Sequence, residues 1–323
     1  MCYNNVNNFF HGIMFHHFHD DIVHHSGQGS IDKKSLLKVI NIIGRNNILN
    51  ADDFLFRYKN NTLTKKNVCF TFDDALQSQV DVAIPILNEF EIKAFFFVYT
   101  SIYTDKPSLF EACRYFRINY YKNIDEFYKE FFLIYSNFKN ADIEKIFIDN
   151  KLIIENLIKK YPVYSDNDSK FRLIRDNLLS QNEYDKIMIE MFKVKDFDYK
   201  STLQRIFINK KDLKKLHDDK HVIGLHSHSH PYHLQNFNYD EQKIEYEKNI
   251  KILSDIISNH KIISMSHPLG LYNDHTFKVL KDLNVTLGFR DDISKSNNMN
   301  KINNSNFELA REDVANILKR AKL

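Results

Sequence analysis

The stretch Val-Cys-Phe-Thr-Phe-Asp-Asp at residues 68–74 decides the fold class. An apolar, β-prone run of five residues ends here in two adjacent carboxylates, which predicts a buried strand at 68–72. Apolar residues at helical spacing follow at 80–90, and a second buried strand is predicted at 94–98. When one helix connects two strands over so short a stretch, the two strands pair in parallel. The sequence therefore predicts an α/β fold.

The same alternation continues on both sides of this unit. Upstream, a short apolar run predicts a strand at 12–15, and a helical pattern follows at 32–43. Downstream, helices and strands are predicted to alternate at 210–219, 222–225, 240–257, 261–265, 275–283 and 285–289. In parallel α/β folds, ligands bind at the carboxyl ends of the strands, so residues that follow the strands are the first candidates for function.

Residues 106–199 interrupt the alternation. Apolar residues lie three and four apart in this stretch, as in amphipathic helices, and no glycine occurs between residues 45 and 223. We therefore predict a discontinuous barrel domain at 1–104 and 206–323 and a mainly helical insertion at 105–205. An insertion beside the strand ends would shape substrate choice.

Composition excludes several classes of protein. With 323 residues and 43 % hydrophobic content the chain can fill a large core, and its 45 basic and 42 acidic residues do not indicate nucleic-acid binding. Three cysteines, odd in number and far apart, argue against a disulfide framework. We recognise no secretion signal and no apolar run of membrane-spanning length, and therefore expect a cytoplasmic protein.

Two groups of polar residues follow predicted strands. Asp73 and Asp74 end the strand at 68–72; one of them could simply cap the next helix, but adjacent carboxylates are costly to bury without positive charge nearby. The cluster His-Ser-His-Ser-His at 226–230 follows the strand at 222–225. It could be a histidine-rich surface loop, but its first and last histidines are four residues apart and can face one ion.

Asp74 can complete a metal site with these two histidines. One carboxylate and the imidazoles of His226 and His230 make a three-ligand set that leaves positions open for water and substrate. An open divalent metal site of this kind is suited to hydrolysis.

At this point the sequence resembles a known family. The order Thr71-Phe72-Asp73-Asp74 and then His226-Ser-x-x-His230 resembles the first two signature motifs of the NodB-homology polysaccharide deacetylases, carbohydrate esterase family 4. The segment at 266–273, Ser-His-Pro-Leu-Gly-Leu-Tyr-Asn, is similar to the family's Pro-x-Gly loop, which lines the substrate groove. The resemblance spans roughly residues 12–104 and 206–290 and implies a distorted (β/α) barrel with fewer than eight regular strands.

The resemblance also implies an activity. The chain would remove an N-acetyl group from an amino sugar with the help of one divalent metal, Zn as first choice and Co, Mn or Ni as alternatives. Asp74, His226 and His230 would hold the metal, and Asp73 would be the catalytic base. Four residues of the third motif would contact substrate: His267, Pro268, Gly270 and Tyr272.

Two features depart from the family pattern. Ser266 stands where many members carry an arginine that orients the base, and no histidine follows His275 to protonate the departing amine. His16 is our candidate acid, because it ends the first predicted strand and family members often have an aromatic residue and a histidine there. Arg290 and Arg311 follow β-like segments and could replace the arginine, although surface arginines are common.

The expected substrate is an N-acylated amino sugar. The absence of a recognisable secretion signal favours a precursor of a surface glycan, and no nucleic acid is expected as a partner. Two alternatives remain open: a deformylase or amidase acting on another N-acyl group, and a catalytically silent glycan-binding protein of the same fold. The departures from the family pattern motivate the second alternative, whereas Asp73 argues against it.

Overall fold

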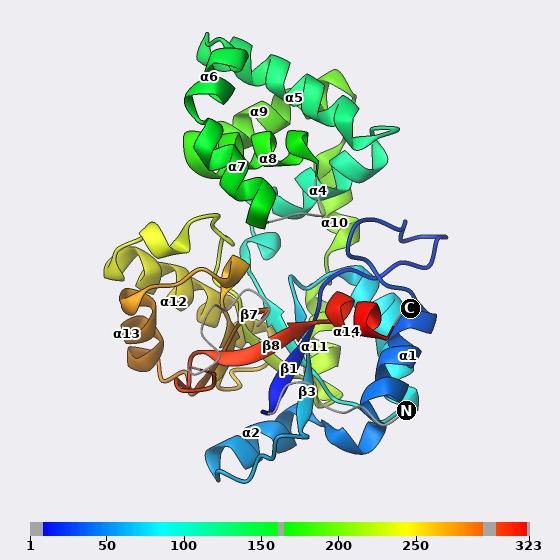
Figure 1. The fold of residues 1–323 in the computed structure, drawn as a ribbon. Helices are drawn as coiled ribbons and strands as arrows, with labels where there is room; N and C mark the ends of the chain where they lie inside the picture. The colour runs from blue at the N-terminus through cyan, green and yellow to red at the C-terminus, as the bar shows by residue number, and fades with distance from the viewer. Residues whose placement is uncertain (1–8, 161–164, 293–301, 322–323) are drawn as a thin grey trace. The chain divides into compact units, whose positions relative to one another are not determined.

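The structure is a computed structural model that describes residues 9–160, 165–292 and 302–321. The chain divides into two compact units (Figure 1). The barrel unit comprises Met1–Pro107 and Gln204–Leu323, and the helical unit comprises Ser108–Leu203. Of the three cysteines, Cys69 and Cys113 are free and buried, and Cys2 lies outside the described residues.

A closed parallel barrel forms the centre of the barrel unit. Among the described residues its ring runs β1–β8–β7–β6–β5–β4–β3, and β3 pairs back with β1, so seven strands close it. The strands are β1 (His11–Phe15), β3 (Val68–Asp73), β4 (Phe95–Val98), β5 (Val222–Leu225), β6 (Ser264–Ser266), β7 (Leu287–Asp292) and β8 (Leu309–Asp313). The prediction of a distorted barrel with fewer than eight regular strands is confirmed; the two-residue β2 (Ile48–Leu49) pairs with β3 outside the ring.

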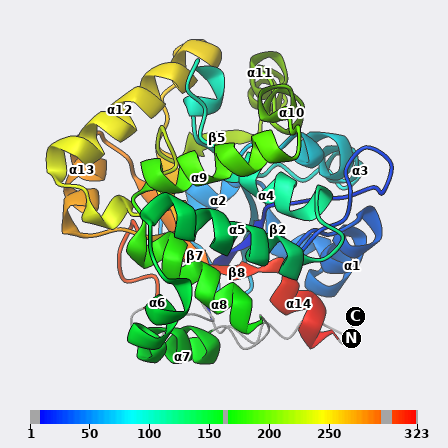
Figure 2. The ribbon, with the colours of Figure 1, turned by 90° about the horizontal axis from the view of Figure 1, so that it is seen from above.

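Helices surround these strands, as Figure 2 shows for α1, α11, α12 and α13. The helices of this unit are α1 (Lys33–Ile43), α2 (Ala51–Lys59), α3 (Ile84–Glu89), α11 (Lys210–Asp218), α12 (Tyr239–Ile256), α13 (Asp274–Asp282) and α14 (Val314–Arg320). The helix predicted at 80–90 begins instead as a π-helical turn, η2 (Gln79–Ala83), before α3. The predicted strand at 285–289 lies slightly later, as β7, and α2, β8 and α14 were not predicted.

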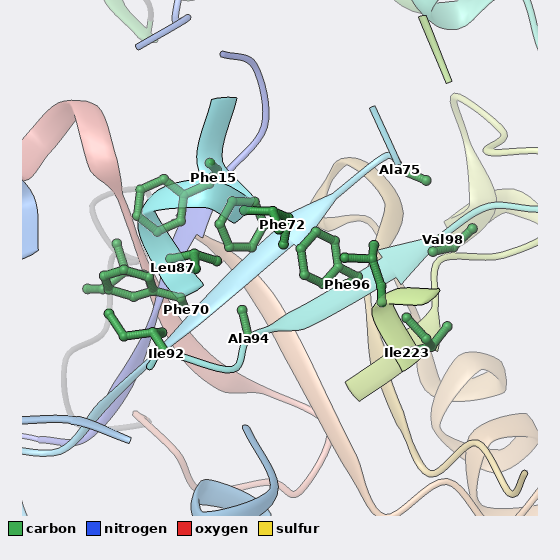
Figure 3. Close-up of a cluster of buried hydrophobic side chains, with 14 of the residues drawn as sticks. Phe15, Phe70, Phe72, Ala75, Leu87, Ile92, Ala94, Phe96, Val98 and Ile223 are labelled. Atoms are coloured by element: carbon green, nitrogen blue, oxygen red, sulfur yellow. The ribbon is translucent and has the colours of Figure 1, made fainter. Parts of the chain in front are cut away.

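Alternating side chains along the strands point to two different cores. Phe70 and Phe72 of β3 face the helices, where they meet Phe15, Phe96 and Leu87 (Figure 3). The residues that alternate with these two along β3 face the barrel interior, where Cys69 packs in a second cluster with side chains of β4, β7, β8 and α2. Because side chains alternate with a period of two, this arrangement also turns Thr71 and Asp73 inward. The apolar pattern of β3 thus decides the direction of its last carboxylate.

The helical unit spans Ser108–Leu203. Its helices are α4 (Phe110–Asn119), α5 (Ile124–Lys139), α6 (Ile143–Asp149), α7 (Lys151–Lys160), α8 (Asp166–Leu173) and α9 (Gln181–Val194), and α10 (Tyr199–Ile206) crosses the unit boundary. Buried aromatic rings, including Phe116, Phe131 and Phe171, fill its core. No helix among the described residues is long and apolar enough to cross a membrane.

Candidate active site

The carboxyl ends of β3 and β5 bring the predicted metal ligands together. Nε2 of His226 and Nε2 of His230 lie 3.4 and 3.5 Å from the same oxygen, Oδ1 of Asp74. One ligand atom from each residue can be chosen so that all three lie within 4.8 Å of one another. All three side chains are buried. The parallel register explains the convergence, because Asp73 pairs with Phe97 on β4, and the next residue of β4 pairs with Leu225, just before His226.

These three residues fit a divalent metal. Oδ1 of Asp74 is buried and has no hydrogen-bond partner among the described residues, an arrangement that costs free energy unless a positive group faces it. Burial alone would raise the pKa of Asp74, but the imidazoles of His226 and His230 outweigh burial and lower it well below its usual range. One carboxylate oxygen and two imidazole nitrogens form a donor set that suits Zn and its first-row neighbours.

The turn that carries Asp74 has an uncommon backbone. Asp74 and Ala75 both have positive φ angles, 74° and 54°, in a region that non-glycine residues seldom occupy. The backbone N–H of Asp74 donates to the carbonyl of Phe97 at 3.1 Å, and the carbonyl of Ala75 accepts from Ile208 at 2.9 Å. Neighbouring segments therefore hold a strained turn in place, as is common at functional sites.

The histidine loop is braced by α12 and β6. The backbone N–H of His226 donates to Asn249 at 3.0 Å, and Nδ1 of His226 lies 2.9 Å from the carbonyl oxygen of Ser266. Glu245 accepts hydrogen bonds from the backbone N–H groups of His228 and Ser229, at 3.0 and 2.8 Å. The side chain of His228 bonds to Thr100 rather than facing Asp74.

Asp73 has a different environment from Asp74. Nη1 of Arg311, on β8, donates to both carboxylate oxygens of Asp73 at 2.8 Å, and the hydroxyl of Ser266 donates to Oδ2 at 3.1 Å. Burial alone would raise the pKa of Asp73, but the charge of Arg311, helped by His226 and His16, lowers it. Asp73 is therefore ionised at neutral pH.

The arginine that contacts Asp73 comes from a different strand than in the family pattern. Arg311 comes from the last strand of the barrel, and Ser266, which occupies the usual place of the arginine, contributes a hydroxyl instead. A β-carbon at Gly12 would lie 3.2 Å from Cγ of Arg311, so the glycine on β1 leaves room for the arginine. Of the two arginines considered from the sequence, Arg290 contributes only its carbonyl, which accepts from Arg311 at 2.6 Å. Both lie within strands rather than after them.

His16 lies at the open side of this carboxylate. Its Nε2 is 3.7 Å from Oδ2 of Asp73, and its side chain is 32 % exposed, so His16 lies between Asp73 and the solvent. The neighbouring histidines have other contacts: the ring of His17 stacks on His16, His19 bonds to Ser30, and His24 bonds to Asp81.

The third motif forms a loop between β6 and α13. His267 and Pro268 are buried, and the Nε2 of His267 donates to the carbonyl of Phe307 at 2.7 Å. Burial lowers the pKa of His267 to about 3, so the ring is neutral. Tyr272 stacks on His267 with ring centroids 4.2 Å apart, and Gly270 adopts a φ of 69°. Gly270 and Tyr272 are the partly exposed members of the four predicted substrate contacts.

Comparisons with solved structures identify proteins of similar fold. Deacetylase PplD from Streptococcus pyogenes, in complex with acetate, is 15 % identical, with a TM-score of 0.53 and 96 % of each chain covered. A de-N-acetylase from Aggregatibacter actinomycetemcomitans is 14 % identical, with a TM-score of 0.50, 94 % of this chain and 95 % of the other covered. IcaB from Ammonifex degensii is 13 % identical, with a TM-score of 0.50, 88 % and 84 % covered. At these identities the likeness shows the fold alone.

The sequence family is shown by a separate comparison. No curated protein matches the chain significantly. The family model for polysaccharide deacetylases, however, matches residues 60–118 and 184–288, which make up just over half of the chain and include both the aspartate pair and the histidine cluster. The chain therefore belongs to the polysaccharide deacetylase family, and it is a hydrolase that acts on the amide bonds of N-acetylated sugars.

Proposed function

We propose that the protein removes the N-acetyl group of an amino sugar by metal-dependent hydrolysis, with Asp73 as the base and with Asp74, His226 and His230 as metal ligands. One observation carries the proposal: two adjacent buried carboxylates face different kinds of basic side chain. Asp74 faces two imidazoles, whereas Asp73 faces Arg311. Environments that differ in this way assign different roles to neighbouring carboxylates.

The donor set favours Zn, with Co, Mn or Ni as alternatives. When bound, such an ion supplies Lewis acidity, which acidifies water and polarises the acyl carbonyl. The chain supplies a buried site, and the bracing of His226 by Ser266 and Asn249 fixes the direction of one imidazole.

Asp73 would take a proton from the attacking water. Its low pKa keeps the carboxylate ionised and ready to accept, and Arg311 and Ser266 fix its orientation. The water oxygen adds to the acyl carbon to give a tetrahedral intermediate, and the carbon–nitrogen bond then breaks as the amine nitrogen takes up a proton. We propose His16 as the donor of that proton, because it lies beside Asp73 and reaches the surface.

The substrate class proposed is an N-acetylated amino sugar in a precursor of a surface glycan. His267, Pro268, Gly270 and Tyr272 would form part of its binding loop, with the exposed edges of Gly270 and Tyr272 facing the sugar. Nothing in the base or the ligand set reads the length of the acyl chain, so an N-formyl or other N-acyl substrate is the alternative.

The test is release of acetate and formate from a panel of N-acylated sugars and sugar conjugates by the metal-loaded protein. Asp73→Asn should keep its metal but lose about 10²–10⁴-fold in kcat, the usual contribution of a base. His226→Ala should lose both metal and activity. Metal binding without release of acetate or formate from any substrate would contradict the proposed reaction, and a wild-type protein that binds no divalent metal would contradict the site.

A further inference from the structure

A buried glutamine lies between the two groups proposed to move protons. Nε2 of Gln79 donates to the carbonyl of Asp73 at 2.6 Å and to the carbonyl of His16 at 2.9 Å, and the residue is 0 % exposed. We infer that Gln79 is a positioning residue that fixes the proposed acid His16 relative to the proposed base Asp73. This inference rests on the roles proposed above for those two residues.

The chemistry of the contact fixes the orientation of the amide. Both partners are carbonyl oxygens, which only accept, so the NH₂ end of Gln79 must face them. Its other end, Oε1, is buried and has no hydrogen-bond partner among the described residues. The two hydrogen bonds that Gln79 makes therefore both go to the backbone of the residues proposed to move protons.

Strand pairing alone does not place His16. The ladder between β1 and β3 ends with Phe15 opposite Phe72, so His16 and Asp73 are the first pair beyond the last registered residues. Beyond that point no β1–β3 ladder pair holds the two segments side by side. Gln79 links them, because one NH₂ group spans the carbonyls of both residues.

The segment around Gln79 holds the rest of the histidine-rich loop as well. The hydroxyl of Ser78 accepts from the backbone N–H of Phe18 at 3.3 Å, and Asp81 bonds to Nε2 of His24 at 2.8 Å. Gln79 begins the π-helical turn η2, a form often found at functional sites. The turn after the aspartate pair therefore contacts the loop at residues 16–24 at three points.

A double-mutant cycle tests the inference. Gln79→Met keeps the volume but removes the donor, and we expect kcat to fall about 10–100-fold, as for a misplaced catalytic group, with KM within about twofold of wild type and bound metal unchanged. Gln77→Met is the matched control, because the Gln77 amide bonds to Asp81 at the surface, and it should stay within about twofold of wild type. In a His16→Gln background, Gln79→Met should cost little more, because its effect acts through His16.

The outcomes separate this inference from the proposed function. If His16→Gln and Gln79→Met each reduce kcat and their effects multiply in the double variant, Gln79 does not act through His16 and the inference is overturned. If His16→Gln keeps wild-type kcat, the acid assignment itself is wrong and the inference falls with it. Should Gln79→Met lose its circular dichroism spectrum, Gln79→Asn, which keeps the donor but shortens its reach, enters the same cycle.

Discussion

At the scale of single residues, Arg311 is the side chain that most directly controls the proposed base. It is buried, and its Nη1 donates to both oxygens of Asp73. Its charge opposes the effect of burial on that carboxylate. The planar guanidinium is well suited to such a contact, whereas a lysine ammonium is a compact point charge on a flexible stem.

Replacing Arg311 should therefore move the pH dependence of the reaction. In Arg311→Met, burial of Asp73 is no longer opposed by the guanidinium, so the pKa of Asp73 rises and the acidic limb of kcat/KM moves to higher pH. Arg311→Lys keeps a positive charge near Asp73, so its acidic limb should lie between those of wild type and Arg311→Met. Its kcat should remain about 10-fold or more below wild type.

The matched control for these variants is Arg290→Lys. The side chain of Arg290 makes no contact with Asp73 among the described interactions, so its replacement should leave the acidic limb in place. An Arg311→Met profile that overlays that of wild type would contradict the assigned role of Arg311.

Residues also show what the sequence can and cannot predict. Asp74, His226 and His230 were expected to lie together because each follows an apolar strand run, and parallel strands end on one side. Arg311 was only one of two open candidates, and Gln79 was not considered. Their contacts with Asp73 depend on barrel closure and on a π-helical turn, which no short-range pattern in the sequence reports.

At the scale of elements, α12 supports the histidine loop from behind. Glu245 and Asn249 lie four residues apart on one face of the helix, and together they bind the backbone N–H groups of three loop residues. The buried side of α12 also carries Tyr246 and Leu253, which pack in the hydrophobic core. The two polar residues, by contrast, serve the loop.

Loss of this support should weaken metal binding. Glu245→Ala leaves the N–H groups of His228 and Ser229 without their acceptor, so the loop relaxes, and we expect metal affinity to fall about 10-fold or more, as for other residues that orient ligands. Competition with a coloured chelator measures the affinity. Glu247→Ala, on the exposed face of α12, is the control, and equal affinities for the two variants would refute the idea.

One feature, the burial of apolar or charged side chains, explains which strands were predicted and which were missed. Strands β3 and β4 were predicted because both of their faces are buried and apolar. Strand β8, with the sequence Leu-Ala-Arg-Glu-Asp, was missed because charged residues interrupt its pattern. Arg311 and Glu312 are buried there nonetheless, since they find partners inside the fold. The buried charged residues of β8 thus both contribute to the site and hide the strand from a search for apolar runs.

At the scale of the whole molecule, the proposed metal would connect parts of the chain that are distant in sequence. Asp74 precedes the helical unit and His226 follows it, so an ion bound to both joins the two sequence segments of the barrel unit. A ligand that binds only the folded state stabilises it by mass action.

Metal removal should therefore lower thermal stability. At a free metal concentration of 100 times Kd the stabilisation is about 2.7 kcal/mol, so a chelator should lower Tm by several degrees. The Tm of His226→Ala should not respond to metal or chelator. A wild-type Tm that is indifferent to both, measured by differential scanning calorimetry, would argue against a bound ion.

The order of strands around the barrel also has a consequence for synthesis. Asp73 and Arg311, whose guanidinium holds it, are separated by 238 positions along the chain. At roughly 5–20 residues per second, a ribosome needs about 12–48 s to travel from one to the other. During that interval the nascent polypeptide carries Asp73 without the guanidinium that offsets the cost of burying its charge. The ion pair between Asp73 and Arg311 therefore cannot form until the ribosome has passed the whole helical unit and reached β8.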